Sequence, residues 1–375
     1  MKTKLLITIT LTLLNLSAFA QTVNIPDANF KAYLVGNNGI NTNGDTEIQV
    51  SEAAAFTGTI NCGNQNISDL TGIEAFTSVT KLLCSFNAIT TINLSQNTAL
   101  TEINLLNNNL SSLDLTQNIA LESLNCGNNP LLATIDISQN IALTLLQVNN
   151  NNLSSLDVSQ NTALNRLICP DNNLTSLDVS QNPDLYLLSV SNNPNLTSLD
   201  TSQNPDLGVL SAFNTGISSL DMSSNTSLVN FSCGDNPNLT SLNLKNLNSA
   251  TLFAFSATNN PNLTCIDVDD VADATANWTN IDPGASYSLN CSPLSVDEEA
   301  INNSLVIYPN PVNTELTLDF DGAIKTVKII DATGKTVKNS SVENSALDVS
   351  GLPKGIYFLQ VFTSEGLASK KFIKN

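Results

Sequence analysis

The sequence predicts a mainly β protein, in which a short helical cap precedes a solenoid with two parallel sheets and a small β-sandwich follows it. Three observations support this prediction. A unit of 21 or 22 residues recurs through the middle of the chain, apolar residues alternate within each half of the unit, and the composition changes after Ser295. Stacked coils bury the apolar face of every unit, which a single unit does not achieve alone.

The repeat is clearest from Leu153, where the chain reads LSSLDVSQNTALNRLICPDNN, LTSLDVSQNPDLYLLSVSNNPN and LTSLDTSQNPDLGVLSAFNTG. Alternating apolar residues indicate a strand with one buried face. The Asn that follows favours a turn, because its amide can hydrogen-bond to the backbone. A half-unit of about eleven residues leaves no room for a helix. We therefore expect two strands and two turns per coil over residues 59–268.

The two halves of the unit follow the patterns L-x-x-L-x-C-x-x-N and L-x-x-L-D-L-x-x-N. Their alternation resembles the nested leucine-rich repeats of bacterial surface proteins. The resemblance recurs at every coil and covers more than half of the chain. It implies a rigid scaffold of the kind that displays a binding surface.

The first twenty residues read as a signal peptide. Lys2 and Lys4 give a basic start, residues 5–14 are apolar, and Ala18-Phe19-Ala20 provides a cleavage site. No later segment is long and apolar enough for a transmembrane helix. The net charge of -19 argues against nucleic acid or an anionic membrane as partner. We therefore expect an exported protein that is secreted or attached to the outer surface.

The sequence contains no histidine. This removes the commonest general base, the commonest metal ligand and the usual serine or cysteine triads. The sequence therefore predicts that the protein is not an enzyme. A hydrolase that uses two neighbouring carboxylates is the remaining catalytic alternative, but a flat repetitive face offers it no pocket.

The cysteines fall into two groups. Five occupy a repeat position that holds Leu, Val or Ala in other coils, which predicts a core position rather than the alternative, a ladder of metal ligands: Cys62, Cys84, Cys126, Cys169 and Cys233. Cys265 and Cys291 lie outside this column, and in an oxidising exterior we expect them to form a disulfide. It would close the end of the solenoid within a cap over residues 269–296, where we expect Trp278 to be a core residue.

The amino-terminal cap is expected over residues 21–58. Residues 25–35 (IPDANFKAYLV) predict a short helix that begins near Pro26 and Asp27. The segment NTNGDTEIQVSE resembles an EF-hand loop, with five candidate calcium ligands: Asn41, Asn43, Asp45, Glu47 through its carbonyl, and Glu52. Asn41 and Thr46 depart from that pattern, where Asp and Gly are usual. Calcium is the only cofactor that the sequence suggests, and a metal-free polar loop is the alternative.

Residues 297–375 predict about seven short strands, hence a small β-sandwich. Their landmarks include YPNP at 308–311, DATGK at 331–335, LPKGIY at 352–357 and KKFIK at 370–374. These motifs resemble the type A sorting domain of the type IX (Por) secretion system. The resemblance implies the secretion machinery as a partner, and it places the sorting signal at these residues: Pro309, Asn310, Pro311, Gly355, Lys370 and Lys371. An ordinary accessory sandwich is the alternative.

The two outer faces of the solenoid differ. The L-D-L half carries a column of aspartates, which we call the aspartate column: Asp114, Asp136, Asp157, Asp178, Asp200 and Asp221. Carboxylates repeated at strand spacing repel one another, so we expect raised pKa values or bound cations. The alternative is a solvated face in which Ser and Thr hydrogen-bond to the carboxylates.

The other half varies from coil to coil and exposes apolar residues among polar ones, which is typical of recognition surfaces. We interpret it as the ligand face, and ordinary drift between repeats is the alternative. Its predicted residues are Leu83, Leu106, Leu145, Arg166, Ile168, Leu187, Val209 and Phe213.

These features together predict a binding protein for an extracellular protein or polysaccharide. A self-associating component of a surface layer or biofilm matrix is the alternative, because the coils vary little. The fold does not identify the ligand.

Overall fold

The computed structural model describes residues 21–291, 304–320, 324–340, 346–363 and 367–375. The predicted signal peptide and the predicted domain boundary at residue 296 lie outside these ranges. The chain forms two compact units, residues 1–291 and 292–375. Each unit has its own hydrophobic core.

The first unit begins with a helical cap, as predicted. Helix α1 (Ala28–Val35) starts after Asp27, whose carboxylate accepts hydrogen bonds from the N–H groups of Asn29 and Phe30. Phe30 and Leu34 point into the core. Helix α2 (Val50–Ala55) has a capping box, and a short 3₁₀ helix, η1 (Ile73–Ala75), follows the first coil. The cap buries the apolar end that the first coil would otherwise expose.

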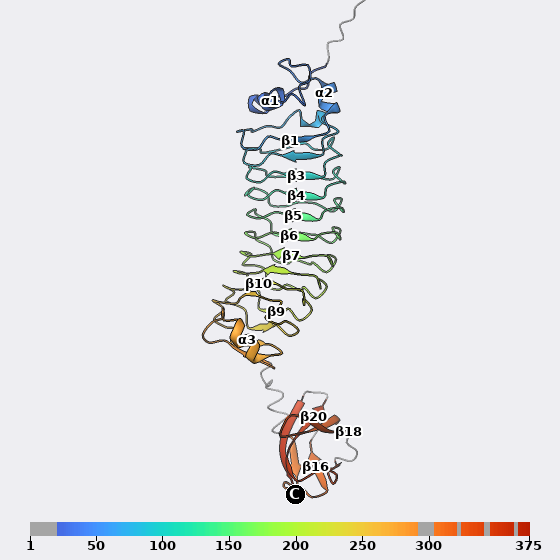
Figure 1. The fold of residues 1–375 in the computed structure, drawn as a ribbon, viewed down its shortest axis with the longest axis vertical. Coiled ribbons are helices and arrows are strands. Elements are labelled where there is room, and N and C mark those ends of the chain that lie inside the picture. Colours follow the sequence, from blue (N-terminus) through green and yellow to red (C-terminus); the bar gives the residue numbers. More distant parts are fainter. Residues whose placement is uncertain (1–20, 292–303, 321–323, 341–345, 364–366) are drawn as a thin grey trace, which may run out of the picture. The chain divides into compact units, whose positions relative to one another are not determined.

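One long parallel sheet runs along the solenoid with one strand per coil, and Figure 1 shows its strands stacked in chain order. In each strand the middle residue is buried and its two neighbours point outward. Its ten strands are β1 (Thr59–Asn61), β2 (Lys81–Leu83), β3 (Glu102–Asn104), β4 (Ser123–Asn125), β5 (Leu145–Gln147), β6 (Arg166–Ile168), β7 (Leu187–Ser189), β8 (Val209–Ser211), β10 (Asn230–Ser232) and β12 (Ala254–Ser256).

The second parallel sheet forms on the L-D-L side, but only in the last coils. Its strands are β9 (Ser219–Asp221), β11 (Ser241–Asn243), β13 (Cys265–Asp267) and β14 (Ser286–Ser288). Two parallel sheets are confirmed, whereas a second strand in every coil is not. The local sequence does not explain the difference, because β9 lies in SLDMSS and the irregular residues 155–160 read SLDVSQ. A ladder between coils depends on their spacing, which the packing of the whole solenoid sets.

The carboxy-terminal cap closes the solenoid. Helix α3 (Val271–Asn277) begins at Asp270, whose carboxylate accepts hydrogen bonds from the N–H groups of Ala272 and Asp273. Trp278 is buried, as predicted, and its ring packs against Phe255 and Tyr287. Its indole N–H donates to the carbonyl of Leu252 at 2.9 Å, so the one polar atom of the ring has a partner.

The second unit is a small antiparallel β-sandwich, as predicted. A three-stranded sheet contains β15 (Val306–Tyr308), β16 (Glu315–Asp319) and β19 (Ala346–Asp348). A four-stranded sheet contains β17 (Ile324–Asp331), β18 (Thr336–Ser340), β20 (Gly355–Thr363) and β21 (Leu367–Lys374). Alternate residues of the strands, such as Leu316, Ile329 and Leu359, form the core between the two sheets.

Candidate binding faces of the solenoid

The long sheet brings four predicted ligand-face residues together. Leu145, Arg166 and Leu187 occupy equivalent positions in β5, β6 and β7, so they form one column across neighbouring coils. Val209 of β8 continues this column. Ile168 lies in the next outward position of β6, and Phe213 follows β8. Leu83 and Leu106 belong to the region of β2 and β3, several coils away.

An aromatic side chain that the repeat pattern did not single out also lies on this face. Tyr186 directly precedes β7 and is 41% exposed. A Cβ atom on Gly208 would lie 2.2 Å from its ring, so the ring rests on the backbone of the next coil. The sequence offered one signal for this contact. Gly208 stands at a repeat position that holds threonine in three earlier coils: Thr80, Thr101 and Thr144. Phe253, at the same position before β12, is 75% exposed.

The basic side chains of the solenoid differ in their partners. Lys81 pairs with Glu102 at 2.7 Å, and Lys245 pairs with Asp267 at 3.6 Å. The exposed guanidinium of Arg166 makes no ion pair or hydrogen bond with any residue that the structure describes. The ligand face therefore carries one cation whose charge the protein leaves unpaired.

The expectation of raised pKa values in the aspartate column is wrong. Hydrogen bonds from the backbone and side chain of the Ser or Thr two residues later lower the pKa of Asp114, Asp136, Asp157 and Asp178. In Asp221, burial raises the pKa, but hydrogen bonds from Ser223 and Asn243 outweigh it and leave the pKa lowered. Repulsion between neighbouring carboxylates is a smaller effect, because these side chains are exposed to water. The alternative interpretation therefore applies to this side of the solenoid: its carboxylates are hydrogen-bonded and face the solvent.

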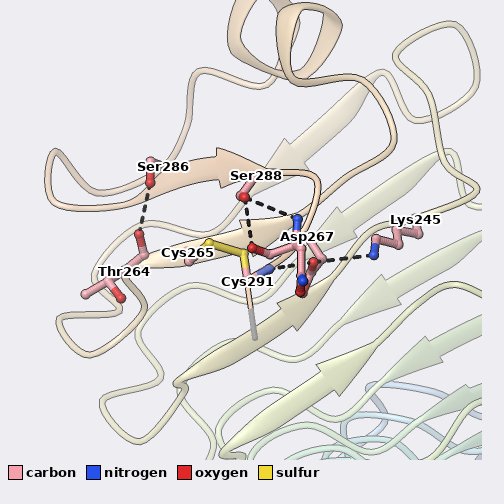
Figure 2. Close-up of a disulfide and its surroundings, with 8 residues drawn as sticks. Lys245, Thr264, Cys265, Asp267, Ser286, Ser288 and Cys291 are labelled. Carbon is pink, nitrogen blue, oxygen red and sulfur yellow. Dashed lines mark hydrogen bonds and ion pairs between the residues drawn. A yellow bond between two sulfur atoms is a disulfide. The ribbon is translucent and has the colours of Figure 1, made fainter. Parts of the chain in front are cut away.

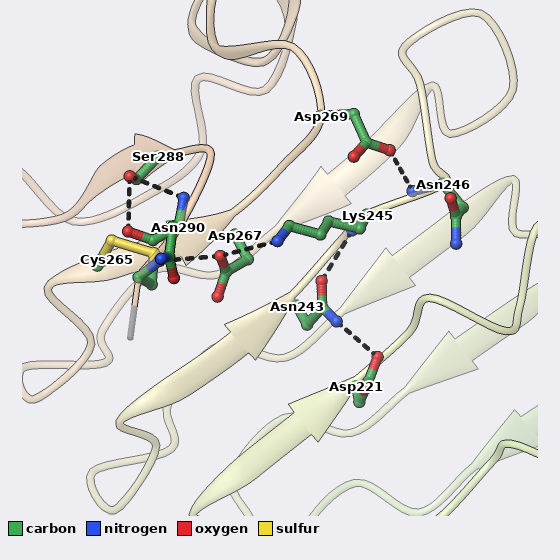
Figure 3. A network of polar contacts seen from close by, with 10 residues as sticks. Asp221, Asn243, Lys245, Asn246, Cys265, Asp267, Asp269, Ser288 and Asn290 are labelled. Atoms are coloured by element: carbon green, nitrogen blue, oxygen red, sulfur yellow. Dashed lines mark hydrogen bonds and ion pairs between the residues drawn. A yellow bond between two sulfur atoms is a disulfide. The ribbon is translucent and has the colours of Figure 1, made fainter. Parts of the chain in front are cut away.

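The aspartate column ends in a polar network at the carboxy-terminal cap (Figure 3). Asn243 donates from its amide to Asp221 at 3.0 Å, and its own amide oxygen accepts the N–H of Lys245. Lys245 reaches Asp267 in the next coil, and Asp267 also accepts the N–H of Cys291 at 2.9 Å. Where the second sheet forms, hydrogen-bond donors and acceptors therefore alternate along this face, in place of the like-charged carboxylates of the aspartate column.

The predicted disulfide is confirmed. Cys265 in β13 is bonded to Cys291, and their Cα atoms are 5.6 Å apart. Figure 2 shows the bond beside Asp267, with Ser286 of β14 hydrogen-bonded to Thr264. The bond ties the segment after β14 to the preceding coil, which fixes the last strand of the second sheet.

The cysteine column is part of the core, as predicted. Its five members are fully buried and carry free thiols. Burial raises the pKa of Cys126 and of Cys169 to about 12, and it raises the pKa of Cys84 and Cys233 as well. Thiols in this state are uncharged at neutral pH, whereas metal ligands and nucleophiles are thiolates.

The calcium-loop residues do come together. The carboxylate of Glu52 accepts hydrogen bonds from the N–H groups of Thr42 and Asn43, at 2.8 and 3.1 Å. Asn41 accepts the N–H of Gly44, and Asp45 accepts the N–H of Glu47. Glu47 also pairs with Lys31 at 2.6 Å. The loop is thus closed by its own hydrogen bonds, and calcium at these residues stays a prediction.

The sorting-signal residues, far apart in sequence, meet in the second unit. The amide of Asn310 donates to the carbonyl of Lys371 at 3.1 Å and accepts the N–H of Ile373 at 2.9 Å. The YPNP segment, with Pro309 and Pro311 on either side of Asn310, is therefore fastened to β21. Gly355 begins β20 opposite Lys374 of β21, and Lys370 lies within β21 opposite Leu359. In the DATGK turn, Asp331 accepts the N–H groups of Thr333 and Lys335.

Two family models match parts of this chain. Residues 306–375 match the secretion system C-terminal sorting domain, and residues 45–140 match the leucine-rich-repeat domain of the endo-beta-N-acetylglucosaminidase EndoS. The chain therefore contains leucine-rich repeats over residues 45–140 and a secretion system C-terminal sorting domain over residues 306–375.

The related proteins include internalins of Listeria monocytogenes. Internalin J of serotype 4b strain F2365 is 47% identical over 53 residues, which are 14% of this chain and 6% of internalin J. The structure of the functional domain of InlJ is 23% identical, with coverage of 95% and 98% of the two chains and a TM-score of 0.36. The internalin InlF of strain 4b F2365 is 17% identical, with coverage of 75% and 96% and a TM-score of 0.51. The likeness to InlF supports the solenoid fold alone.

Within the described part of the chain, no helix has the length and apolar character needed to cross a membrane.

Proposed function

We propose that this protein is a secreted or surface-attached binding protein that recognises an extracellular protein or polysaccharide through the outer face of the long sheet. The observation that carries the proposal is the cluster of outward side chains on β5 to β8. Leu145, Ile168 and Leu187 are partly exposed there, next to an unpaired cation. Exposed apolar groups on a rigid sheet lose water when a partner covers them, and this favours association.

Export by the type IX secretion machinery is part of the proposal. The match of residues 306–375 to a sorting domain supports it. The signal-peptide pattern of residues 1–20 agrees with passage through the inner membrane first.

We propose further that the protein has no catalytic activity of its own. Paired-carboxylate chemistry needs a group that stays protonated near neutral pH. In the aspartate column, hydrogen bonds lower the pKa of Asp114, Asp136, Asp157 and Asp178 instead. This trend supports a scaffold role over a hydrolase.

A binding screen tests the proposal. The chain from residue 21 to 375 is applied to arrays of extracellular proteins and glycans, with and without calcium. A triple variant, Ile168→Ser, Leu187→Ser and Phe213→Ser, should lose saturable binding that the unmodified chain shows. The matched control replaces three apolar residues that are each 62% exposed outside this face: Ile119, Leu131 and Ile141. Equal binding by both triple variants would exclude this face as the ligand site.

Self-association is a second candidate function. Ile119 and Ile141 occupy the same position in adjacent coils, and both are exposed away from the ligand face. Surface-layer assembly through them predicts that the unmodified chain forms large particles in light scattering. The control triple variant would then remain monomeric, whereas the ligand-face variant would still assemble.

A further inference from the structure

We propose that Arg166 is the centre of the ligand face and that it binds a carboxylate of an extended acidic polypeptide segment, flanked by apolar side chains. This inference rests on the proposed function, because it names the chemical class of the ligand for the same face. It adds a charge requirement and a single central residue, neither of which follows from an apolar surface alone.

The charge distribution of the solenoid favours a carboxylate as the group that Arg166 binds. The chain carries 33 acidic and 14 basic residues, and between Ala53 and Asn290 its basic residues are Lys81, Arg166 and Lys245. The structure pairs the two lysines with Glu102 and Asp267. Arg166 has no such partner among the described residues, so its charge is available to a ligand. An acidic segment approaching this solenoid is repelled almost everywhere else, which directs its carboxylate to Arg166.

Apolar side chains flank the guanidinium of Arg166. The register of the long sheet places Leu145 on one side of Arg166 and Leu187 on the other, each about 4.8 Å away between backbones. Ile168 is the next outward residue of the same strand. A ligand that covers these side chains removes water around the guanidinium, and charge pairing is stronger in the resulting low dielectric. A guanidinium also holds a carboxylate through two parallel hydrogen bonds.

Aromatic and aliphatic side chains lie in the coils that follow Arg166. The ring of Tyr186 rests on Gly208, where any side chain would collide with it. Val209 and Phe213 lie in the same coil as Gly208 and point outward. Arginine and tyrosine beside aliphatic side chains are the composition of interface hot spots. Gly208 is therefore a positioning residue, because it leaves the space that the Tyr186 ring needs.

The apolar composition favours a polypeptide over an acidic polysaccharide. Leucine, isoleucine and valine side chains offer no hydrogen bonds to sugar hydroxyl groups, and burying those hydroxyl groups against them is costly. A polypeptide can place its own apolar side chains on both sides of one Asp or Glu. The ligand that fits this face is thus an apolar–acidic–apolar segment.

The test uses an array of synthetic peptides in which one Glu stands between Leu and Phe residues, with a paired set in which Gln replaces that Glu. Binding of the chain from residue 21 to 375 is measured by fluorescence anisotropy at low and high salt. The unmodified chain should prefer the Glu peptides, and added salt should reduce that preference. The Arg166→Gln variant should bind the Glu peptides about tenfold more weakly and the Gln peptides unchanged.

The matched control is Lys81→Gln, which removes an exposed cation from the same sheet that is already paired with Glu102. This variant should bind both peptide sets like the unmodified chain. A Gly208→Ala variant should weaken both sets, because the added methyl group displaces the Tyr186 ring. Unchanged circular dichroism and thermal midpoints for Arg166→Gln would show that its fold is intact.

The outcomes separate this inference from the proposed function. If Arg166→Gln binds Glu peptides as well as the unmodified chain does, while the apolar triple variant loses them, the ligand face stands and the role of Arg166 is overturned. If a uronate or sulfated polysaccharide displaces the peptides through Arg166, the assignment to a polypeptide is overturned. If neither variant changes any binding, both proposals fail.

Discussion

The two edges of the solenoid carry asparagine in nearly every coil, with Thr215 and Leu247 as exceptions, yet the amide oxygens on the two edges have different partners. The first asparagine ladder follows the long sheet: Asn87, Asn108, Asn129, Asn151, Asn172, Asn193, Asn236 and Asn260. The second asparagine ladder lies on the opposite edge: Asn97, Asn118, Asn140, Asn161, Asn182, Asn204 and Asn225. In the first ladder the amide N–H groups donate to carbonyls of their own and of the preceding coil, as in Asn172. In the second ladder both acceptors belong to the preceding coil, as in Asn161.

The amide oxygens distinguish the two ladders. In the first, the oxygen of Asn172 accepts the N–H of Leu153 from the preceding coil at 3.1 Å, and the oxygen of Asn193 accepts the N–H of Leu174. In the second, six buried oxygens accept no hydrogen bond from the described residues: those of Asn97, Asn118, Asn140, Asn161, Asn182 and Asn204. An unsatisfied buried acceptor costs free energy, so the same motif stabilises one edge more than the other.

Thr201 supplies a hydrogen-bond donor to the second ladder, and the equivalent residue Val179 of the preceding coil cannot. The hydroxyl of Thr201 donates to the amide oxygen of Asn225 at 2.8 Å, while Asn225 donates back to the carbonyl of Thr201. In the neighbouring coil, Asn204 makes the equivalent bond to the carbonyl of Val179. Val179 has no hydroxyl, and the oxygen of Asn204 accepts no hydrogen bond from any residue that the structure describes. A single apolar side chain per coil thus separates a satisfied amide from an unsatisfied one.

The largest expected effect tests the difference between the ladders directly. Asn172→Ala should lower the free energy of unfolding by about 3 kcal/mol and Asn161→Ala by about 2 kcal/mol. The first effect is larger because Asn172→Ala leaves a backbone N–H without its acceptor, whereas both changes leave carbonyls without a donor. Urea unfolding of the two variants, monitored by circular dichroism, gives both values. A larger loss for Asn161→Ala would reverse the ranking of the two edges.

The next effect concerns the partner of the second ladder. Thr201→Val should lower the free energy of unfolding by about 1–2 kcal/mol, because it leaves the oxygen of Asn225 without a donor. Val179→Thr should raise it by about 1 kcal/mol, because threonine has nearly the shape of valine and supplies a donor to Asn204. The control is Val148→Thr, at the position whose carbonyl accepts the amide of Asn172. The oxygen of Asn172 already accepts the N–H of Leu153, so the added hydroxyl is buried without this gain and should destabilise the chain. Destabilisation by Val179→Thr as large as in the control would show that the unsatisfied oxygen carries no cost.

A third prediction concerns the exposed turn beside the first ladder. The residue there has positive φ in successive coils and is Asn or Asp from Asn107 onward, whereas Phe86 adopts φ 56° with a side chain that is 56% exposed. Asparagine tolerates this conformation better than a bulky residue. Phe86→Asn should therefore stabilise the chain by about 1 kcal/mol in urea unfolding. Phe86→Ala serves as the control, and an equal gain from alanine would assign the effect to lost exposed apolar surface.

The smallest expected effect is the pH dependence of stability that the aspartate column contributes. The ladders do not titrate, but the folded-state pKa values of Asp114, Asp136, Asp157 and Asp178 lie below the unfolded value of about 3.9. Their contribution to stability is present above about pH 4 and is lost as pH falls through the folded-state pKa values. A variant with Asn at all four positions should therefore lose less stability than the unmodified chain between pH 5 and pH 2. Identical losses would show that these carboxylates do not couple to folding.

Much of the fold could be predicted from the sequence, because it depends on local spacing. Alternation of apolar residues identified the core positions, and the cap helix begins after Asp27 within the predicted segment. The candidate site was less predictable. Periodicity placed Leu145, Arg166 and Leu187 on one face, but the ring of Tyr186 on Gly208 depends on contact between two coils. The pKa direction of the aspartate column depends on hydrogen-bond geometry that charge spacing alone does not give.

The sequence by itself determined the repeat, its buried positions, the pairing of Cys265 with Cys291 and the sandwich that follows. These follow from periodicity and composition, which are properties of neighbouring residues. Only the tertiary structure decided where the second sheet forms, which asparagine oxygens find a donor, and how Asn310 meets β21. The physical reason is that hydrogen bonds act over about 3 Å, so they depend on how coils and strands distant in sequence are spaced.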